Sequence, residues 1–326
     1  MVFSAIIFSM ILVTGATGFI GRALIRQLSE SGHPLRALIR PSRRSPRLPK
    51  GVPVEVAVVS MADTRGLRAA LNGVDVIFHL AGAESQGRNA DLRVTDIQGT
   101  RNLVEVAKDA GIQHFIYVSH IGAARASGYP VFKAKGIAEE FIRHSGIPYT
   151  ILRSSIVFGP EDHFTSGLAR MVRSAPGIFF IPGGGRTVVQ PLWVEDLVAC
   201  LIWSLENPAT MYQVLEVGGS EYFTVQQVLE IIMSTVHAPR FLVEVPIVVL
   251  RAITISLESF IPRYPASSFW VDYIAVSRTC AADSTARAFG LMPTRFTYRL
   301  DYLARKPWWL RLSSWFTSHL PAKHNK

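Results

Sequence analysis

Apolar and polar positions alternate along the first half of the chain in a way typical of parallel sheets covered by helices. Short, mainly apolar runs predict buried strands, and longer amphipathic runs between them predict helices. The predicted strands are Ile11–Thr14, Leu35–Ile39, Val54–Val59, Val74–Leu80, Phe115–Ser119 and Tyr149–Arg153. The predicted helices are Gly21–Ser31, Thr64–Leu71, Asp96–Ala110 and Phe132–His144. This pattern predicts an α/β fold with a Rossmann-type, doubly wound parallel sheet.

Glycines mark the ends of the predicted helices. Gly32, Gly73, Gly111 and Gly146 each follow a helical stretch and precede a strand. Glycine closes a helix cheaply because it adopts the left-handed conformation without steric cost. These glycines therefore support the predicted alternation.

The pattern becomes mixed after Arg153. The segments predicted there are the Pro/Gly-rich loop Gly177–Gly185, the helix Trp193–Leu205, the strand Val214–Val217, a helix with a capping box of Thr224 and Gln227, an apolar helix between Pro246 and Pro262, and the short helix Ser284–Phe289. We predict a dinucleotide-binding domain over residues 10–153, with strands of the same unit continuing to about 220. A smaller C-terminal substrate or interaction region follows over 154–304, interleaved with the sheet, and a basic aromatic tail over 305–326.

The first predicted strand runs into a glycine-spaced turn. Gly15 permits the tight turn, Gly18 lets the backbone approach a pyrophosphate, and Gly21 allows the helix to pack closely on the strand. The helix N-terminus adds free amides and the positive end of a dipole. The predicted cofactor-binding residues of this turn are Gly15, Thr17, Gly18, Phe19, Ile20 and Gly21. The alternative is a structural turn that binds no ligand.

Basic residues follow the second predicted strand, where an NAD site normally has an acid. An Asp or Glu about 20 residues after the glycines binds the ribose 2′-hydroxyl of NAD. Between Glu30 and Glu55 the chain has no acidic residue. Arg40 follows the strand instead, with Arg43 beyond it, and guanidinium groups suit a 2′-phosphate. We therefore expect NADP(H) rather than NAD(H); the alternative is a solvated basic loop that leaves the preference unset.

Composition narrows the class of protein. Of the 326 residues 49% are apolar and 18% charged, which fits a packed core and excludes wholesale disorder. Cys200 and Cys280 give neither a disulfide framework nor metal-ligand spacing, so we expect no metal and a reducing compartment.

No apolar run reaches the length of about 18 residues that predicts a spanning helix. Met1–Ser9 lacks the basic start of a signal peptide, and Met10 is an alternative start.

The net charge of +10 indicates a nucleic acid, a membrane surface or a phosphate-bearing ligand. In the tail, Trp308, Trp309 and Trp315 stand beside basic residues, with no acid after Asp301. Such a segment suits an anionic membrane interface or a protein partner, and without a recognition motif it disfavours nucleic acid. The apolar helix after Pro246 either packs on the C-terminal region or meets a membrane. We expect a cytoplasmic protein, peripheral at the inner face of a membrane.

Further sequence motifs accompany the glycine-spaced turn after the first predicted strand. They are Val76–Gly82, Asp96–Val104, Ile116–Ser119, Thr150–Ser154, Val188–Asp196 and Val217–Ser220. Together they resemble the short-chain dehydrogenase/reductase superfamily in its extended and atypical branches. The chain is most similar to proteins like the nucleotide-binding accessory subunit of respiratory complex I and to NmrA-like proteins, which often bind NADPH without demonstrated turnover. The resemblance implies further cofactor contacts from Ser60, Met61, Leu80, Ala81, Gly82 and Lys135. Ser60 stands where the family often has an aspartate.

Reductases of this superfamily use a Tyr-x-x-x-Lys pair, in which the lysine lowers the tyrosine pKa and the phenol exchanges a proton as hydride moves. Tyr129 and Lys133 have this spacing, and Ser119 would hydrogen-bond a substrate carbonyl. In the alternative register Lys135 holds the lysine position. Val131, four residues earlier, then stands where the tyrosine should be and cannot donate a proton.

These observations leave two leading functions. The protein is either an NADPH-dependent reductase of a hydrophobic, lipid-like carbonyl substrate or a cofactor-binding accessory protein at a membrane. A nucleotide-sugar epimerase or dehydratase is an alternative, but it would favour NAD, which the arginines after the second strand oppose. A non-catalytic redox-sensing scaffold is a further alternative.

Overall fold

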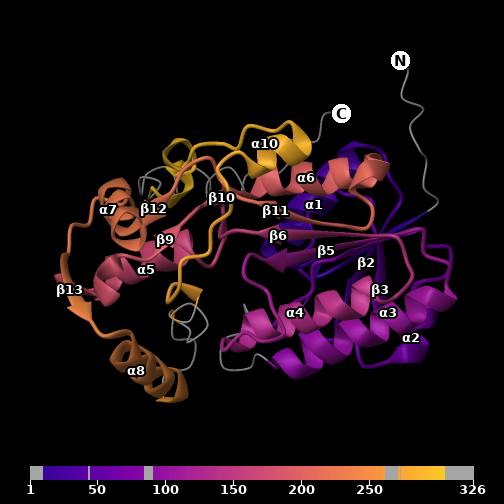
Figure 1. Cartoon of the computed structure of the whole chain (residues 1–326), viewed down its shortest axis with the longest axis horizontal. Coiled ribbons are helices and arrows are strands. Elements are labelled where there is room, and N and C mark those ends of the chain that lie inside the picture. The colour runs from indigo at the N-terminus through magenta and orange to yellow at the C-terminus, as the bar shows by residue number, and fades with distance from the viewer. Residues whose placement is uncertain (1–9, 43–44, 84–90, 261–270, 272, 305–326) are drawn as a thin grey trace, which may run out of the picture.

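A seven-stranded parallel sheet forms the centre of the protein (Figure 1). The computed structural model describes residues 10–42, 45–83, 91–260, 271 and 273–304. The sheet has the order β11-β6-β5-β4-β1-β2-β3, with strands β1 (Ile11–Thr14), β2 (Leu35–Ile39), β3 (Glu55–Val58), β4 (Val76–His79), β5 (His114–His120), β6 (Tyr149–Ser154) and β11 (Gln213–Val217). The order reverses between β1 and β4, so the loops after these strands separate and leave a crevice. This confirms the predicted Rossmann-type fold.

Helices cover both faces of the sheet, as Figure 1 shows. One face carries α1 (Phe19–Glu30) and α6 (Val194–Glu206), and the other carries α2 (Thr64–Ala70), α3 (Gly99–Asp109) and α4 (Pro130–Arg143). Within β1, Ile11 and Val13 pack into the first layer and Leu12 into the second, because alternate strand residues face opposite sides. Burial on both faces explains why the strands are apolar runs.

The C-terminal region has an apolar core of its own, which includes Phe158, Phe164 and Phe296 and which Phe132 of α4 joins. Its elements are β7 (Val157–Phe158), α5 (Thr165–Ser174), β8 (Ile178–Pro182), β9 (Val188–Val189), β10 (Leu192–Trp193), β12 (Phe223–Thr224), α7 (Val225–Thr235), β13 (Phe241–Val245), α8 (Ile247–Phe260) and α10 (Ser284–Phe289). The short strands pair as β7 with β10, β9 with β12 and β8 with β13. Strand β11 borders β6, so both halves of the sequence contribute to the main sheet.

Several local predictions are confirmed. The four capping glycines have φ angles of +78°, +72°, +70° and +80°. Thr224 and Gln227 form the reciprocal capping box of α7. The predicted loop Gly177–Gly185 is wrong in part, because Ile178–Pro182 forms β8 and pairs with β13. Its bulky apolar residues outweighed the loop signal of the flanking glycines and prolines.

Helix α8 is the apolar helix predicted after Pro246. It leaves Val248, Val249, Ile253 and Ile255 exposed. Within the described ranges, no helix combines the length and the apolar character needed to cross a membrane. The N-terminal residues 1–9 and the tail 305–326 lie outside the described residues.

Candidate functional site

A cavity of about 980 Å³ opens at the carboxyl edge of the main sheet. Residues that follow β1, β2, β3, β4, β5 and β6 line one side of it, and loops and helix α5 of the C-terminal region line the other. In open α/β sheets, ligands bind at this edge where the strand order reverses. The cavity is therefore the candidate functional site.

The glycine turn after β1 lines the cavity. Gly15 has a φ of +67°, and a Cβ there would stand 2.6 Å from the carbonyl carbon and oxygen of Leu80. A Cβ on Gly21 would overlap the carbonyl oxygen of Gly15, so α1 packs closely against the turn only because this residue is glycine. Gly18 caps α1 without a side-chain hydrogen bond. No side-chain oxygen of the cap therefore takes up the first amides of α1. That these amides bind a phosphate stays a prediction.

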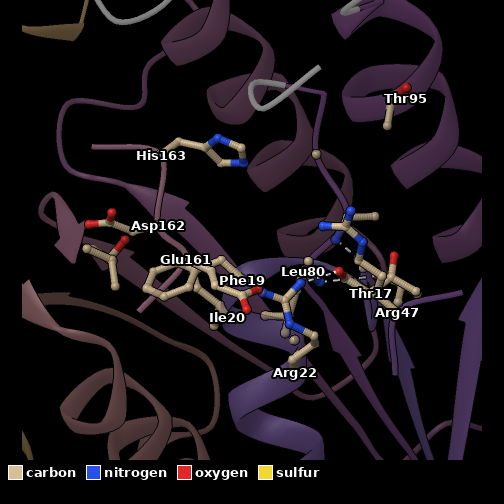
Figure 2. A pocket seen from close by; sticks show the side chains of 18 of the residues that line it. Thr17, Phe19, Ile20, Arg22, Arg47, Leu80, Thr95, Glu161, Asp162 and His163 are labelled. Atoms are coloured by element: carbon tan, nitrogen blue, oxygen red, sulfur yellow. Dashed lines mark hydrogen bonds and ion pairs between the residues drawn. The ribbon is translucent and has the colours of Figure 1, made fainter. Parts of the chain in front are cut away.

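Arg22 extends back over this turn from the first part of α1. Its guanidinium donates a hydrogen bond to the carbonyl oxygen of Thr17 at 2.8 Å and forms an ion pair with Glu161 at 2.7 Å. Figure 2 shows Arg22 and Thr17 on one side of the cavity and Asp162 and His163 on the other. Arg22 therefore connects the glycine turn to the loop that follows β7 and places a positive charge beside the turn.

The arginines near β2 separate into two groups. Arg36, within the strand, pairs with Glu55 at 2.8 Å and donates to the carbonyl oxygens of Ala70 and Asn72, so it is used structurally. Arg40 and Arg47 are exposed and line the cavity. Arg43 lies outside the described residues. Arg47 was not predicted as a cofactor contact, because six residues separate it from Arg40 and no periodic pattern connects the two.

Ser60, Met61, Leu80, Ala81 and Gly82, predicted as cofactor contacts, line the cavity at the ends of β3 and β4. Side chains of neighbouring elements form hydrogen bonds with the backbone of three of these residues. The Asn102 side chain donates to the carbonyl oxygen of Met61 at 2.9 Å. The hydroxyl of Thr14 accepts hydrogen bonds from the amides of Leu80 and Ala81 at 3.2 and 3.3 Å. Their contact with a cofactor stays a prediction.

A buried histidine fixes the same two strand ends. The Nδ1 of His79 lies 2.7 Å from the Thr14 hydroxyl, and its Nε2 lies 2.8 Å from the Thr100 hydroxyl. Burial, and to a smaller extent the charge of Lys135, lower the pKa of His79 to about 3. His79 is therefore neutral at physiological pH and positions the strand ends.

The far side of the cavity is built from residues that the sequence did not single out. The Asp162 carboxylate accepts hydrogen bonds from the amide and hydroxyl of Thr165 and from the amide of Ser166, at 2.6 to 3.1 Å. The Thr165 hydroxyl also bonds to the Tyr302 hydroxyl at 2.6 Å. Burial raises the pKa of both Asp162 and Tyr302. Tyr302 is distant in sequence from the other two, so no local motif signalled this cluster.

Comparisons with known proteins agree with this geometry. A family described as NAD(P)H-binding matches residues 15–167. The mitochondrial NADH dehydrogenase (ubiquinone) 1 alpha subcomplex subunit 9 of Arabidopsis thaliana is 30% identical over 260 residues, 78% of this chain and 64% of that protein. The chain belongs to the NAD(P)H-binding, atypical short-chain dehydrogenase/reductases. This confirms the resemblance stated from the motifs.

Other proteins similar to this chain are named as enzymes. The ceramide reductase of Caulobacter vibrioides is 30% identical over 198 residues, 60% of this chain and 61% of that protein. The chain spans less than two thirds of the length of these two relatives. An epimerase structure from Methanothermobacter thermautotrophicus has a TM-score of 0.73 and 18% identity, with 95% of each chain covered, and shows the shared fold.

The predicted Tyr–Lys pair of the superfamily does not meet at the cavity. Tyr129 caps the N-terminus of α4, and its ring centroid lies 5.0 Å from the guanidinium carbon of Arg278. Lys133 is exposed, and neither residue belongs to the cavity lining. The hydroxyl of Ser119 donates to Glu139 at 2.6 Å instead of pointing to a ligand. Tyr129 stands at the cap rather than inside the helix, because α4 begins at Pro130.

Lys135, predicted as a cofactor contact, is buried and does not belong to the cavity lining. Its ammonium nitrogen lies 3.3 Å from the Asp96 carboxylate, and both side chains are almost fully buried. The other oxygen of Asp96 accepts the amide of Ala83 at 2.9 Å, so the pair fixes the loop after β4. Val131, four residues before Lys135, is also buried. In this register no phenol stands where the superfamily has its proton donor.

Proposed function

We propose that the protein binds NADP(H) in preference to NAD(H) and holds it, without turnover, as an accessory protein at a membrane. The observation that carries this proposal is the cavity itself. It joins a glycine turn and the N-terminus of α1 to Arg40 at the end of β2 and to Arg47 in the loop that follows. Val131 at the expected tyrosine position and the buried Lys135–Asp96 pair support a role without proton donation from a Tyr–Lys pair.

The preference for NADP(H) rests on charge at the end of β2. Arg40 and Arg47 line the cavity there. The carboxylates among the described lining residues, Glu161 and Asp162, belong to the loop after β7 instead. A ribose 2′-phosphate therefore meets guanidinium groups, whereas a 2′-hydroxyl finds no carboxylate of β2 to accept its hydrogen bond.

Arg40→Glu is expected to weaken NADPH binding by roughly 10- to 100-fold, because a charge-assisted hydrogen bond contributes about 1.5–3 kcal/mol and the new carboxylate repels the phosphate. NADH affinity should change by less than about threefold, since NADH has no 2′-phosphate. Calorimetric titration with each nucleotide measures both effects. The control is Arg68→Glu, on the exposed side of α2. Equal losses for NADPH and NADH would refute the proposed preference.

The membrane part of the proposal rests on an apolar surface at one end of the molecule, where Figure 1 shows β13 and α8. We call this surface the apolar end. It comprises Ile178 and Phe180 of β8, Phe241 and Val243 of β13, and Val248, Val249, Ile253 and Ile255 of α8, all exposed. Ile178 pairs with Phe241 and Phe180 with Val243, so these four side chains share one face of the two-stranded sheet.

A lipid surface suits this end better than solvent does. Phe241 is 81% exposed and Val248 75%, although monomeric proteins seldom leave large apolar clusters in water. Arg240 directly precedes β13 and Arg251 lies in α8, whereas β13 itself carries one acid, Glu244. The chain as a whole has a net charge of +10. Exposed apolar side chains beside basic residues bind anionic interfaces through burial and charge together.

The double variant Phe241→Glu, Val248→Glu is expected to weaken binding to vesicles of phosphatidylglycerol and phosphatidylcholine by at least about tenfold. Co-sedimentation measures the bound fraction. Met292→Glu is the matched control, because Met292 is 77% exposed but lies outside the apolar end. Unchanged sedimentation of the double variant would show that this surface does not bind lipid.

A further inference from the structure

The far side of the cavity is basic as well as apolar. Helix α5 contributes Arg170 and Arg173, which are three residues apart and line the cavity from one helix face. His163, in the loop before α5, lines it beside them. None of these three side chains belongs to the glycine turn or to the β2 end, so the proposed cofactor contacts do not account for them.

The carboxylates near this group are already engaged. Glu161 pairs with Arg22, and Asp162 accepts hydrogen bonds from the amides and hydroxyl of its own turn. Arg170 forms no ion pair with any described residue, and its Nε donates only weakly to the carbonyl oxygen of Ser166 at 3.3 Å. A guanidinium that lines a cavity without a carboxylate partner is a ready donor to an anion.

The electrostatics of His163 show that the positive charges converge. Loss of water around the ring lowers the pKa of His163, the Asp162 charge opposes this, and the charges of Arg170 and Arg22 lower the pKa further. Cations from α5 and from α1 therefore act on the same part of the cavity. Apolar and aromatic side chains also line the cavity: Ile156, Val157, Ala169, Tyr273, Tyr302 and Leu303.

We propose that this side of the cavity binds a second ligand, an amphipathic anion, whose phosphate or carboxylate group meets Arg170 while its apolar part lies against Tyr273 and Leu303. The inference rests on the proposed function in one respect, that NADP(H) occupies the glycine-turn side. The cofactor's pyrophosphate is the other source of the same anionic chemistry. It has donors of its own in the amides of α1 and in Arg22.

The test uses octyl phosphate as probe and the full chain saturated with NADPH. Calorimetry is expected to show binding of octyl phosphate, weaker binding of inorganic phosphate, and a loss of at least about tenfold for both in Arg170→Gln. NADPH affinity, titrated separately, should stay within about twofold of wild type in this variant. Arg143→Gln, an exposed arginine in the last turn of α4, is the matched control and should bind both probes normally.

Two results would overturn the inference. Octyl phosphate bound equally well by wild type and Arg170→Gln would show that Arg170 does not hold the anion. A loss of NADPH affinity in Arg170→Gln, with no octyl phosphate bound to the NADPH complex, would assign Arg170 to the cofactor's pyrophosphate. If wild type fails to bind NADPH, the proposed function fails, and the same octyl phosphate titrations on the free protein still decide the role of Arg170.

Discussion

Gly21→Ala is expected to abolish measurable NADPH binding at concentrations that saturate the wild type. The new Cβ would overlap the carbonyl oxygen of Gly15 and stand 2.9 Å from the Cα of Ala16, both backbone atoms of the phosphate turn. Overpacking of this kind costs about 1–3 kcal/mol in stability, and the turn must move away from α1. Displaced amides no longer converge on a phosphate, so the affinity should fall by at least about 30-fold. Calorimetry measures the affinity, and urea denaturation the stability.

The matched control is Gly167→Ala, a glycine-to-alanine change within α5 where a Cβ would meet nothing within 4 Å. Alanine favours helix over glycine by about 1 kcal/mol, so this variant should be slightly more stable than wild type and should bind NADPH normally. If Gly21→Ala bound NADPH with wild-type affinity, the glycine turn would not be the phosphate site.

Acidification from pH 7 to pH 5 is expected to lower the free energy of unfolding by about 4 kcal/mol through two buried histidines. The pKa of His79 is lowered to about 3 by burial and then by Lys135, and burial lowers the pKa of His114 to about 4. In the unfolded chain both titrate near 6.5. The folded state disfavours their protonation, so their contribution is complete above about pH 6.5 and is lost as the pH falls toward the folded pKa values. At pH 5 each costs about 2 kcal/mol.

Urea denaturation at the two pH values measures this effect. His79→Gln should reduce the pH-dependent loss by about 2 kcal/mol, since glutamine does not titrate, although it also disturbs the hydrogen bonds to Thr14 and Thr100. His144→Gln, the same substitution at an exposed histidine, is the matched control. The same pH dependence in His79→Gln as in wild type would contradict the buried, neutral state of His79.

The central fold was predictable because its signals are local and repeat. Apolar runs such as Ile11–Thr14 are buried on both faces, and each following helix ends at a glycine that the backbone needs in the left-handed region. The glycine turn was predictable for the same reason: the close approaches at Gly15 and Gly21 leave no room for a side chain. Here local pattern and global structure impose the same requirement.

The far side of the cavity was not predictable, because tertiary contacts assemble it. Tyr302 reaches Thr165 across 137 positions of sequence, and Arg170 acquires its place only through the packing of α5 beside the cavity. The Tyr129–Lys133 spacing matched a motif, yet Tyr129 precedes the helix and neither residue lines the cavity. Spacing alone does not specify register.

Calorimetric titration of the wild-type protein with NADPH, and separately with NADH, shows whether the carboxyl-edge cavity is a dinucleotide site. We expect one NADPH site per chain, weaker binding of NADH, and recovery of the NADPH unchanged after the titration. Absence of binding by either nucleotide would contradict the assignment of the carboxyl-edge cavity as a dinucleotide site.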